Sequence, residues 1–597
     1  MRESADAARL LEEGQRFEDA GNVDLALDCY RDAVMVAPGV PRTHMNVALA
    51  LQKLARTEEA LTAARQAVRC DPSFMPARFN LSQLLVGQGD LALAEMELKE
   101  CLRLVPDFID ARVALADLRD LQGDEAGSER ELRAALNSDA GHRGAALNLL
   151  QLLLRQRRYG DAETFLYREI AGDANFAATV LANVLTSLNE STNADNETIF
   201  EVHRWFGRFI EDAAKPAFDY WPNRPDANRR LRIGYVSGDF REHPIAWFMR
   251  PVLEHHDRAS FDVHCYSTFG EPNERARALQ SLTSHWHNVS SLLDRQFAEQ
   301  VRNDAIDVLI DLSGHTAHNR LAAFALRPAP VQATWLGYLN TTGLASIDWR
   351  ICDRHTDPVG ETERFHVERL FRLPASQWCY RPWHDVPEPS TPRAPASDGL
   401  VFGSFNQHER ISDACVDLWS RLLHCLPNAR LRLIDVRNHM IANALEARFV
   451  KRGISRDRLE MHGRLPLDAY FEAIGGVNIA LDTMPYSGAT TALNVLWMGV
   501  PVVGLRGKHS LSRGCFSILN TLGLPDLCAD SPDDYIAVNV RLASDESWRQ
   551  SLRSTLRQRM LASPLMDAPA FVSALEAGYR MMWRAWCGTA PLRGATK

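Results

Sequence analysis

A 34-residue period near the start of the chain constrains its fold more than any other feature. Small residues recur at this interval, and so do prolines: Ala26, Ala60 and Ala94, with Pro38, Pro72 and Pro106. Each period contains two segments whose apolar residues follow helical spacing, such as LALDCYRDAVMVAP for the second segment of the first period. We therefore predict stacked helix pairs. A degenerate fourth copy has Ser128 at the alanine position, and a fifth has Ala162.

The residue types at the repeat positions explain how such pairs would pack. Small residues allow two helices to approach closely, glycines at 21, 89 and 123 fit the turn between the helices, and the proline ends the second helix. The pattern resembles the tetratricopeptide repeat, which implies an all-α superhelix over residues 1–176 with a concave face for an extended peptide. Two other uses stay open: the repeats could only support the rest of the chain, or they could join copies of it into a homo-oligomer.

From residue 231 the pattern changes to apolar strands that alternate with helices. RIGYVSGDF, FDVHCYS and IDVLIDLSG form one series, and GLVFGSFNQ, ARLRLIDV, RLEMHG, VNIALDTMP and GVPVVGL form a second. This alternation is typical of a doubly wound parallel sheet. We predict two Rossmann-like domains facing one cleft, at 230–385 and 399–597, with a helical linker at 177–229 before them and a Pro-rich linker at 386–398 between them.

Composition excludes several classes of protein. The net charge of −9 gives no overall attraction for a polyanion, so we expect no nucleic-acid partner. No apolar run is long enough for membrane insertion, and the acidic start MRESADAARLLEEG does not fit a secretory signal. The eleven cysteines never form a CxxC pair, which favours a cytoplasmic location over a disulfide framework or a structural zinc site.

Candidate site residues follow strands, because ligands of open α/β sheets bind beyond the carboxyl ends of the strands. In the first domain, His243 lies in the loop after RIGYVSGDF, although a lone histidine is more often structural. His315 and Thr316 follow IDVLIDLSG at the same predicted edge and are candidates for the acceptor or sugar side of the site.

The second domain offers a seat for a diphosphate. Gln407 and Arg410 follow the strand in GSFNQHER, and an arginine ahead of a helix start, itself positive, favours a bound anion. After the strand in NIALDTMP, Ser487, Gly488, Thr490 and Thr491 begin a helix whose free N–H groups suit phosphate. The motifs GxGxxG, GxxxxGK[ST], HExxH and GxSxG are absent. So is the DxD metal clamp, and we expect no metal and no cofactor other than the co-substrate.

At these residues the chain resembles the protein O-GlcNAc transferase family, including its plant SPINDLY branch and bacterial relatives. The strings that carry the resemblance are RIGYVSGDFREHP, DLSGHTAHNR, FALRPAPVQATWLGY, TTGLASIDWRICD, FGSFNQ, IALDTMPYSGATTALNVLWMGVPVV and ASPLMDAPAF. The resemblance implies repeats followed by a GT-B-type pair of domains. It also implies inverting, metal-independent transfer of a sugar, GlcNAc from UDP-GlcNAc, to Ser or Thr hydroxyls of protein or peptide acceptors that the repeats recruit.

The resemblance also implies roles for single residues. His243 matches the family's active-site histidine, and Gln407 and Arg410 match residues that hold the diphosphate. The remaining matches concern the nucleotide-sugar: Thr490 and Thr491 at the helix start, Asn494 at a ribose contact, and Tyr470 at a base-stacking position.

Three positions depart from the family pattern. Arg410 stands in place of a lysine, Ala489 in place of a histidine and Asn494 in place of an aspartate. Arginine keeps the charge with a different geometry, and asparagine keeps an acceptor without the charge. Two alternatives therefore stay open: a dedicated transferase for one bacterial protein such as flagellin, using GDP-fucose or a CMP-nonulosonate, and a non-catalytic repeat scaffold.

Overall fold

The computed structural model describes residues 2–54, 56–166, 168, 180–185, 188–189, 194–270, 273–383 and 399–589. The linker predicted at 386–398 lies outside these residues. The chain divides into two compact units, and each is described by itself. The first is Met1–Val184 with His439–Ala444, and the second is Leu185–Asn438 with Leu445–Lys597.

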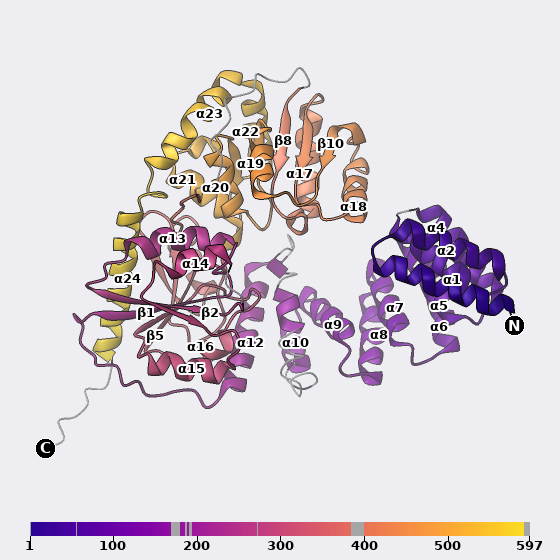
Figure 1. Cartoon of the computed structure of the whole chain (residues 1–597), viewed down its shortest axis with the longest axis horizontal. Helices are drawn as coiled ribbons and strands as arrows, with labels where there is room; N and C mark the ends of the chain where they lie inside the picture. Colours follow the sequence, from indigo (N-terminus) through magenta and orange to yellow (C-terminus); the bar gives the residue numbers. More distant parts are fainter. Residues whose placement is uncertain are drawn as a thin grey trace. The chain divides into compact units, whose positions relative to one another are not determined.

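The first unit contains the repeats as five successive helix pairs (Figure 1). Their bounds are α1 Arg2–Asp19 and α2 Val23–Val36, α3 Pro41–Lys53 and α4 Thr57–Cys70, α5 Met75–Gln88 and α6 Leu91–Leu104, α7 Ile109–Leu121 and α8 Glu125–Ser138, α9 Arg143–Arg155 and α10 Tyr159–Phe165. The second helix of the first three pairs ends two residues before Pro38, Pro72 or Pro106, as the sequence predicts.

The repeated small residues lie at the closest contacts. Ala26, Ala60 and Ala94 have no exposed surface, and Ser128 and Ala162 are buried at the same position of the later pairs. Gly21, Gly89 and Gly123 have φ between 81° and 84°, a backbone region that favours glycine. The period therefore marks both the turn within each pair and the core between helices, which confirms the predicted repeats.

The second unit contains two parallel sheets. The first has the order β3-β2-β1-β4-β5-β6-β7, with Ile233 of β1 beside Val308 of β4. Its strands are β1 Leu231–Ser237, β2 Phe261–Ser267, β3 His285–Asn288, β4 Val308–Asp311, β5 Val331–Trp335, β6 Trp349–Asp353 and β7 Arg369–Leu373. Nearly continuous burial of β1, β2, β4 and β5 explains their apolar sequences, because both faces of the sheet are covered.

The second sheet has the order β10-β9-β8-β11-β12-β13, with Ile479 of β11 beside Phe402 of β8. Its strands are β8 Val401–Ser404, β9 Arg430–Leu433, β10 Leu459–Met461, β11 Ile479–Leu481, β12 Val502–Leu505 and β13 Cys528–Ala529. Helical repeats followed by two parallel-sheet α/β domains confirm the predicted fold class.

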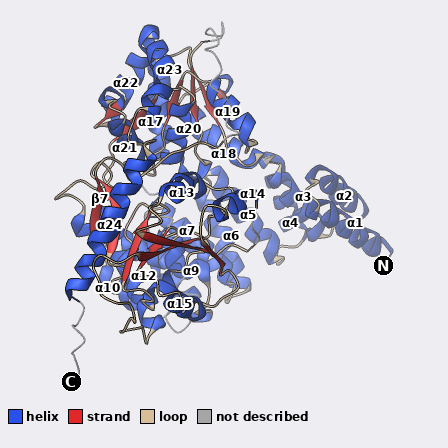
Figure 2. Ribbon diagram, turned by 60° about the vertical axis from the view of Figure 1, so that its left-hand side comes forward, coloured by secondary structure: helices blue, strands red, loops and turns tan. Residues whose placement is uncertain are grey.

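Helices cover both sheets (Figure 2). Around the first sheet, α13 Pro244–His255 packs against α14 Glu274–Gln280, and α15 Asp294–Asn303 packs against α16 Leu321–Ala325. Figure 1 shows these two pairs on opposite faces of the strands. The second domain contributes α17 Asp413–Cys425, α18 His439–Val450, α19 Leu467–Gly475, α20 Ala489–Trp497, α21 Gly514–Thr521, α22 Pro532–Ser544 and α23 Glu546–Leu561.

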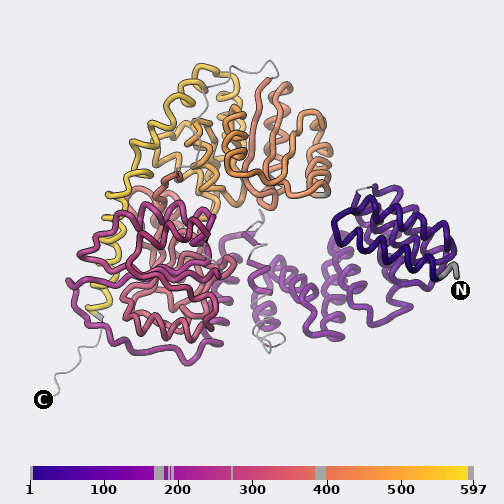
Figure 3. Tube along the Cα trace, in the orientation of Figure 1, coloured from indigo at the N-terminus to yellow at the C-terminus, as the bar shows by residue number. Residues whose placement is uncertain are grey.

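The last helix returns to the first sheet. α24 (Ala568–Thr589) packs against α13, β5 and β7, and its yellow tube runs beside the magenta domain (Figure 3). The Glu576 carboxylate accepts a hydrogen bond from His256 at 2.8 Å, and Tyr579 bonds Tyr235 at 3.0 Å. The end of the chain therefore joins the two α/β domains.

A helix ahead of the first sheet fixes one of its loops. The segment IFEVHRWFGRFIEDA, part of the linker that the sequence predicts to be helical, lies in α12 (Asn196–Ala214). Its Gly207 faces Gly343 so closely that a Cβ on Gly207 would overlap the carbonyl oxygen of Gly343. A Cβ on Gly343, where φ is 80°, would in turn overlap the carbonyl oxygen of His203.

Gly343→Ala should therefore destabilise the second unit. We expect the free energy of unfolding to fall by about 2–5 kcal/mol, because left-handed backbone strain adds to the overlap with α12. The matched control is Gly360→Ala, since Gly360 has φ 83° but no atom within 4 Å of the added Cβ. Gly360→Ala should lose only about 1–2 kcal/mol, which is the cost of the left-handed backbone without the overlap. Denaturant unfolding of both variants measures the difference, and equal losses would contradict the close contact.

Candidate active site

Both sheets reverse their strand order at one point, and the candidate residues flank these points. In the first sheet the order reverses between β1 and β4, so the loops that carry His243 and His315 are neighbours. In the second it reverses between β8 and β11, so the loop with Gln407 and Arg410 lies beside the loop that leads to Gly488. Such reversals open a crevice beyond the strand ends, where α/β sheets bind ligands.

His243 caps the helix that follows β1. Its Nδ1 accepts a hydrogen bond from the backbone N–H of Ile245 at 3.4 Å and lies 3.6 Å from Oδ2 of Asp239. The side chain is 37% exposed. Burial lowers the pKa of His243 below its usual value, while Asp239 acts to raise it and Arg241 to lower it. The ring is therefore neutral near pH 7, beside a buried carboxylate.

His315 and Thr316 are held by the protein itself. The His315 Nε2–H donates to the carbonyl of Thr342 at 2.9 Å, and its ring packs edge-on against Phe206 and Tyr338. Burial lowers the pKa of His315 to about 4. The Thr316 hydroxyl donates to the carbonyl of Ser313 at 2.8 Å. Both side chains organise the loop after β4.

A half-buried carboxylate organises the loop after β11. Asp482 accepts a hydrogen bond from the Gly488 N–H at 2.8 Å, one from the Ser487 hydroxyl at 2.5 Å and one from the Asn406 amide at 3.4 Å. The Ser487 oxygen also accepts from the N–H of Cys515 at 2.8 Å. The Ser487 hydroxyl, which the sequence suggested as part of the anion seat, is thus engaged inside the loop.

The candidate anion seat is the first turn of α20. Gly488 is its N-cap, and the helix begins at Ala489, so the N–H groups of Ala489, Thr490 and Thr491 have no acceptor within the helix. Both threonines are half-buried. A Cβ on Gly488 would overlap the Asn406 side chain, which explains why glycine is required there.

Arg410 lies beside the loop that leads to this turn, and not in the first turn of a helix. It ends a short 3₁₀ turn, His408–Arg410, and Ser412 rather than Arg410 caps α17. Its guanidinium stacks 3.9 Å from the ring centroid of Tyr486. Burial raises the pKa of Asp482, and the charge of Arg410 acts to lower it. Tyr486 and Asp482 therefore stabilise part of the positive charge of Arg410, for which the sequence alone suggested a bound anion. Gln407 is exposed beside it.

Tyr470 and Asn494 form a polar cluster within this second domain. The Asn494 carboxamide oxygen accepts a hydrogen bond from the Tyr380 hydroxyl at 3.0 Å, and Asn494 is only 7% exposed. Burial raises the pKa of Tyr470 to about 12, and Asn494 and Thr491 beside its hydroxyl oppose that rise. Asn494 thus bridges two tyrosines, so a ribose contact would have to compete with them.

Aromatic stacking brings the two strand edges together. Trp247 on α13, one turn after His243, stacks on Phe471 of α19 with centroids 6.2 Å apart and on Tyr380 at 6.3 Å. Phe471 is the neighbour of Tyr470. The helix that His243 caps therefore packs against the helix that carries Tyr470. A neutral imidazole on one side and an anion seat on the other suit the transfer of a group away from a phosphate.

Comparison with known proteins decides the family. A family model described as glycosyl transferase family 41 matches residues 208–379 and 392–575, more than half of the chain. The chain belongs to glycosyl transferase family 41.

Individual relatives agree with this assignment. The family 41 chain is 35% identical over 416 residues to the probable UDP-N-acetylglucosamine-peptide N-acetylglucosaminyltransferase SPINDLY of Petunia hybrida, covering 68% of the chain and 44% of the relative. It is 30% identical over 376 residues to the probable transferase of that name, SEC, of Arabidopsis thaliana, covering 60% and 38%. The chain spans less than half the length of these curated relatives.

One solved structure is similar over the whole length. It is a mutant of the Thermobaculum terrenum O-GlcNAc transferase, with a TM-score of 0.65, 31% sequence identity and coverage of 99% of both chains. The succession of repeats and two α/β domains is therefore shared from end to end.

Sequence reasoning about this family 41 site missed several residues. Asp239, Tyr380, Asp482 and Tyr486 support the predicted ones. The sequence could have indicated Asp482, because an acid directly follows the buried strand of VNIALDTMP, and Asp239 stands in the corresponding place after β1. No sequence pattern indicated Tyr380, because it contacts Asn494 across 114 residues of sequence.

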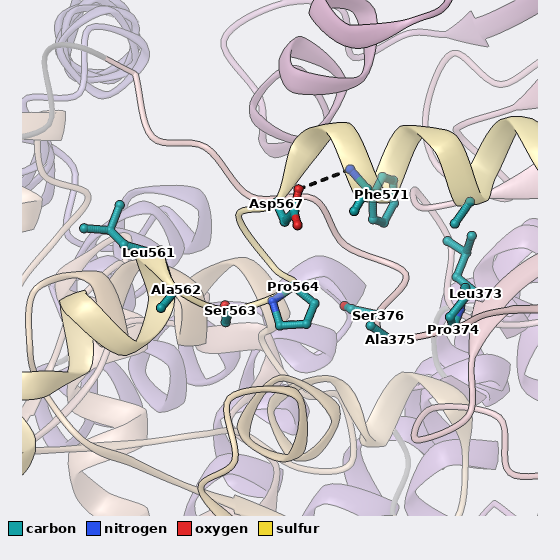
Figure 4. A pocket seen from close by; sticks show the side chains of 12 residues that line it. Leu373, Pro374, Ala375, Ser376, Leu561, Ala562, Ser563, Pro564, Asp567 and Phe571 are labelled. Atoms are coloured by element: carbon teal, nitrogen blue, oxygen red, sulfur yellow. Dashed lines mark hydrogen bonds between the residues drawn. The ribbon is translucent and has the colours of Figure 1, made fainter.

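One cavity lies apart from these residues. A pocket of about 630 Å³ lies between the end of β7 and the α23–α24 turn, and its lining includes Leu373, Leu561, Pro564 and Phe571 (Figure 4). None of the predicted site residues lines it. Separately, none of the helices in the described parts of the chain has both the length and the apolarity needed to cross a membrane.

Asp482→Ala should loosen the loop before α20. We expect unfolding to become easier by about 2–4 kcal/mol, since hydrogen bonds from Gly488, Ser487 and Asn406 lose their charged acceptor. The control is Asp533→Ala, because Asp533 is 85% exposed and pairs with Arg421 in a surface ion pair. It should change stability by less than about 1 kcal/mol. Denaturant unfolding compares the two variants, and a similar small loss in both would refute this role for Asp482.

Proposed function

We propose that this chain is a protein O-glycosyltransferase that moves a sugar from a nucleotide diphosphate to Ser or Thr hydroxyls, with UDP-GlcNAc as the donor. The observation that carries the proposal is the anion seat at the start of α20 with Arg410 beside it, at the strand reversal of the second sheet. Membership of family 41 and the relatives' names, which specify UDP-N-acetylglucosamine and peptide, support the donor and the acceptor class.

The reaction that we propose is a single displacement with inversion. The acceptor oxygen forms a bond to the anomeric carbon while the bond from that carbon to the diphosphate breaks, and the hydroxyl proton leaves the acceptor. The leaving diphosphate gains negative charge. Arg410 stabilises this charge with its own positive charge, and the free N–H groups of Ala489, Thr490 and Thr491 stabilise it with dipoles of fixed direction. We propose that this protein charge, rather than a divalent cation, serves the leaving group.

His243 organises the acceptor side in this proposal. When Nδ1 accepts from Ile245, the neutral ring carries its proton on Nε2 and donates to a substrate oxygen. When the proton moves to Nδ1 and faces Asp239, Nε2 accepts a proton from the acceptor hydroxyl. The 3.6 Å separation from Asp239 allows the second form after a small shift. On the donor side, Gln407 binds the diphosphate and Tyr470 stacks against the nucleotide's base. Asn494 holds Tyr470 in place.

The rest of the chain serves delivery of the acceptor. We propose that the repeats, assigned to residues 1–176, recruit protein substrates, and that the enzyme works in the cytoplasm. In this assignment 177–229 links the repeats to the acceptor-side domain at 230–385, and 386–398 leads to the donor-side domain at 399–597.

Ligand stabilisation followed by turnover tests the function. We expect UDP and UDP-GlcNAc to raise the unfolding midpoint more than GDP, CMP or their sugar conjugates, because a ligand that binds only the folded state stabilises it. Arg410→Ala should lower kcat/KM for transfer from UDP-GlcNAc to a Ser/Thr peptide library by about 100–1000-fold and leave peptide binding intact. The control is Arg421→Ala, an exposed arginine on α17.

Other outcomes identify the alternatives. A preference for GDP-fucose or a CMP-nonulosonate would assign the chain to dedicated modification of one protein. A lack of stabilisation by every nucleotide would favour a non-catalytic scaffold. Normal turnover by Arg410→Ala would exclude the proposed stabilisation of the leaving group.

Asp239→Asn should shift the pH dependence of transfer. The pKa of His243 lies below its usual value through burial, and Asp239 opposes that shift. Activity that needs neutral His243 should therefore decline only below about pH 6.5 in the unaltered chain. Loss of the carboxylate lowers this pKa further, so the acid limb of kcat/KM moves to lower pH while the plateau falls. Rate profiles from pH 4.5 to 8.5 measure both, and an unmoved limb would mean that Asp239 does not act on His243.

A further inference from the structure

Three histidines and two aspartates gather at an outer edge of the first sheet, apart from all candidate site residues. Asp262 and His264 alternate along β2, and His285 and His287 alternate along the edge strand β3. Alternate residues of a strand point to one face. The register places His264 beside His285 and Tyr266 beside His287, so the histidines share that face, and Asp304 follows α15 nearby.

The distances within the cluster suit metal ligands. The His285 Nε2 lies 3.3 Å from Asp262 Oδ1, and the His264 Nε2 lies 3.8 Å from Asp262 Oδ2. Around His264 two overlapping sets arise, one with Asp262 and His285 and one with His287 and Asp304. In each set the three ligand atoms lie within 4.8 Å of one another. The His264 and His285 rings stack 4.0 Å apart.

The ring nitrogens of His264 are buried and lack hydrogen-bond partners, which points to a bound ligand. His264 is only 5% exposed, and neither of its ring nitrogens has a hydrogen-bond partner. The Nε2 of His287 is also buried without one. A buried polar group without a partner costs free energy of about 1–3 kcal/mol, so three such nitrogens in one cluster require an explanation. An ion between the rings supplies it.

We propose that this cluster, with His264 as the shared ligand, binds a divalent transition-metal ion of the zinc type. Imidazole nitrogens combined with one carboxylate suit zinc, cobalt or nickel, whereas calcium and magnesium prefer oxygen ligands alone. Binding requires the ligand atoms to close in slightly, because zinc holds histidine nitrogen at about 2.0–2.1 Å.

Neighbouring side chains are placed to orient the ligands. The Tyr266 hydroxyl donates to Asp304 Oδ2 at 2.7 Å. The Gln300 carboxamide lies 3.1 Å from the Nδ1 of His287, and its oxygen and nitrogen can exchange places, so it can accept the Nδ1–H and leave Nε2 for a metal. Such outer contacts are typical of metal-binding histidines and carboxylates. Arg230 at 3.2 Å and Arg232 at 4.0 Å are the competing partners of the Asp262 carboxylate.

The bound ion would serve the fold rather than the transfer reaction. β3 is a four-residue edge strand, and ligands from both strands would fasten it to β2. The His285 side chain is 42% exposed, which gives the ion a path from solvent. The inference does not rest on the proposed function, since no residue of the candidate active site takes part.

The test uses the full chain without an affinity tag, stripped of metal by a chelator. Zn²⁺ titrated by calorimetry should bind with a stoichiometry of one at this site and raise the unfolding midpoint, while Mg²⁺ should do neither. Co²⁺ should produce visible absorption bands that His264→Leu removes. We expect His264→Leu, and His285→Ala or His287→Ala, to weaken Zn²⁺ binding by at least about tenfold. His424→Ala, at an exposed histidine of α17, is the matched control.

The single variants separate the two ligand sets. A loss confined to His285→Ala assigns the ion to Asp262, and a loss confined to His287→Ala assigns it to Asp304. If His264→Leu does not fold, these more exposed positions carry the test. Zn²⁺ binding that is absent in the unaltered chain, or equal in all variants and the His424→Ala control, would overturn the proposal.

Discussion

Carboxylates at the ends of parallel strands hold in place the edges of the sheets where the candidate site lies. A parallel strand that ends in a loop leaves backbone N–H groups without partners, and burying them unpaired would be costly. Asp311 ends β4 and accepts the N–H groups of Ser313 and Gly314. Asp353 ends β6 and accepts the N–H groups of His355, Thr356 and Gln377. It also accepts a hydrogen bond from the Ser517 hydroxyl of the other domain at 3.0 Å. The same device thus shapes the loops and joins the domains.

Asp482 applies this device where the donor would bind. Its bonds to Gly488 and Ser487 hold the residues before α20, so the free N–H groups of the first helical turn keep fixed directions. Dipoles that are already oriented stabilise a developing negative charge without reorganising, which is where most electrostatic catalysis originates. The stacking of Arg410 on Tyr486 likewise fixes a flexible cation beside the seat before a ligand arrives.

The sequence predicted those parts of the fold that depend on local periodicity. The 34-residue period marked the helix pairs, and apolar runs marked β1, β2, β4 and the strands from β8 to β12. The strands β3, β5, β6, β7 and β13 were not identified, and β3 shows why: its sequence HWHN is polar and only half-buried at a sheet edge. At the site, loops after strands could be predicted because the reversal of strand order makes them neighbours. The partners of Asn494 could not, since Tyr380 reaches it from another domain.

His243 and His315 illustrate what determines the use of a residue type. Both follow strands that are neighbours in the first sheet, and in both burial lowers the pKa. His315 is surrounded by Phe206, Tyr338 and His203, and its Nε2–H is given to a backbone carbonyl. His243 stands at a helix start with a carboxylate on one side and solvent on the other, so one nitrogen remains for a substrate. The packing partners that each loop meets, drawn from distant parts of the chain, separate a histidine whose ring is engaged inside the protein from one whose ring reaches solvent.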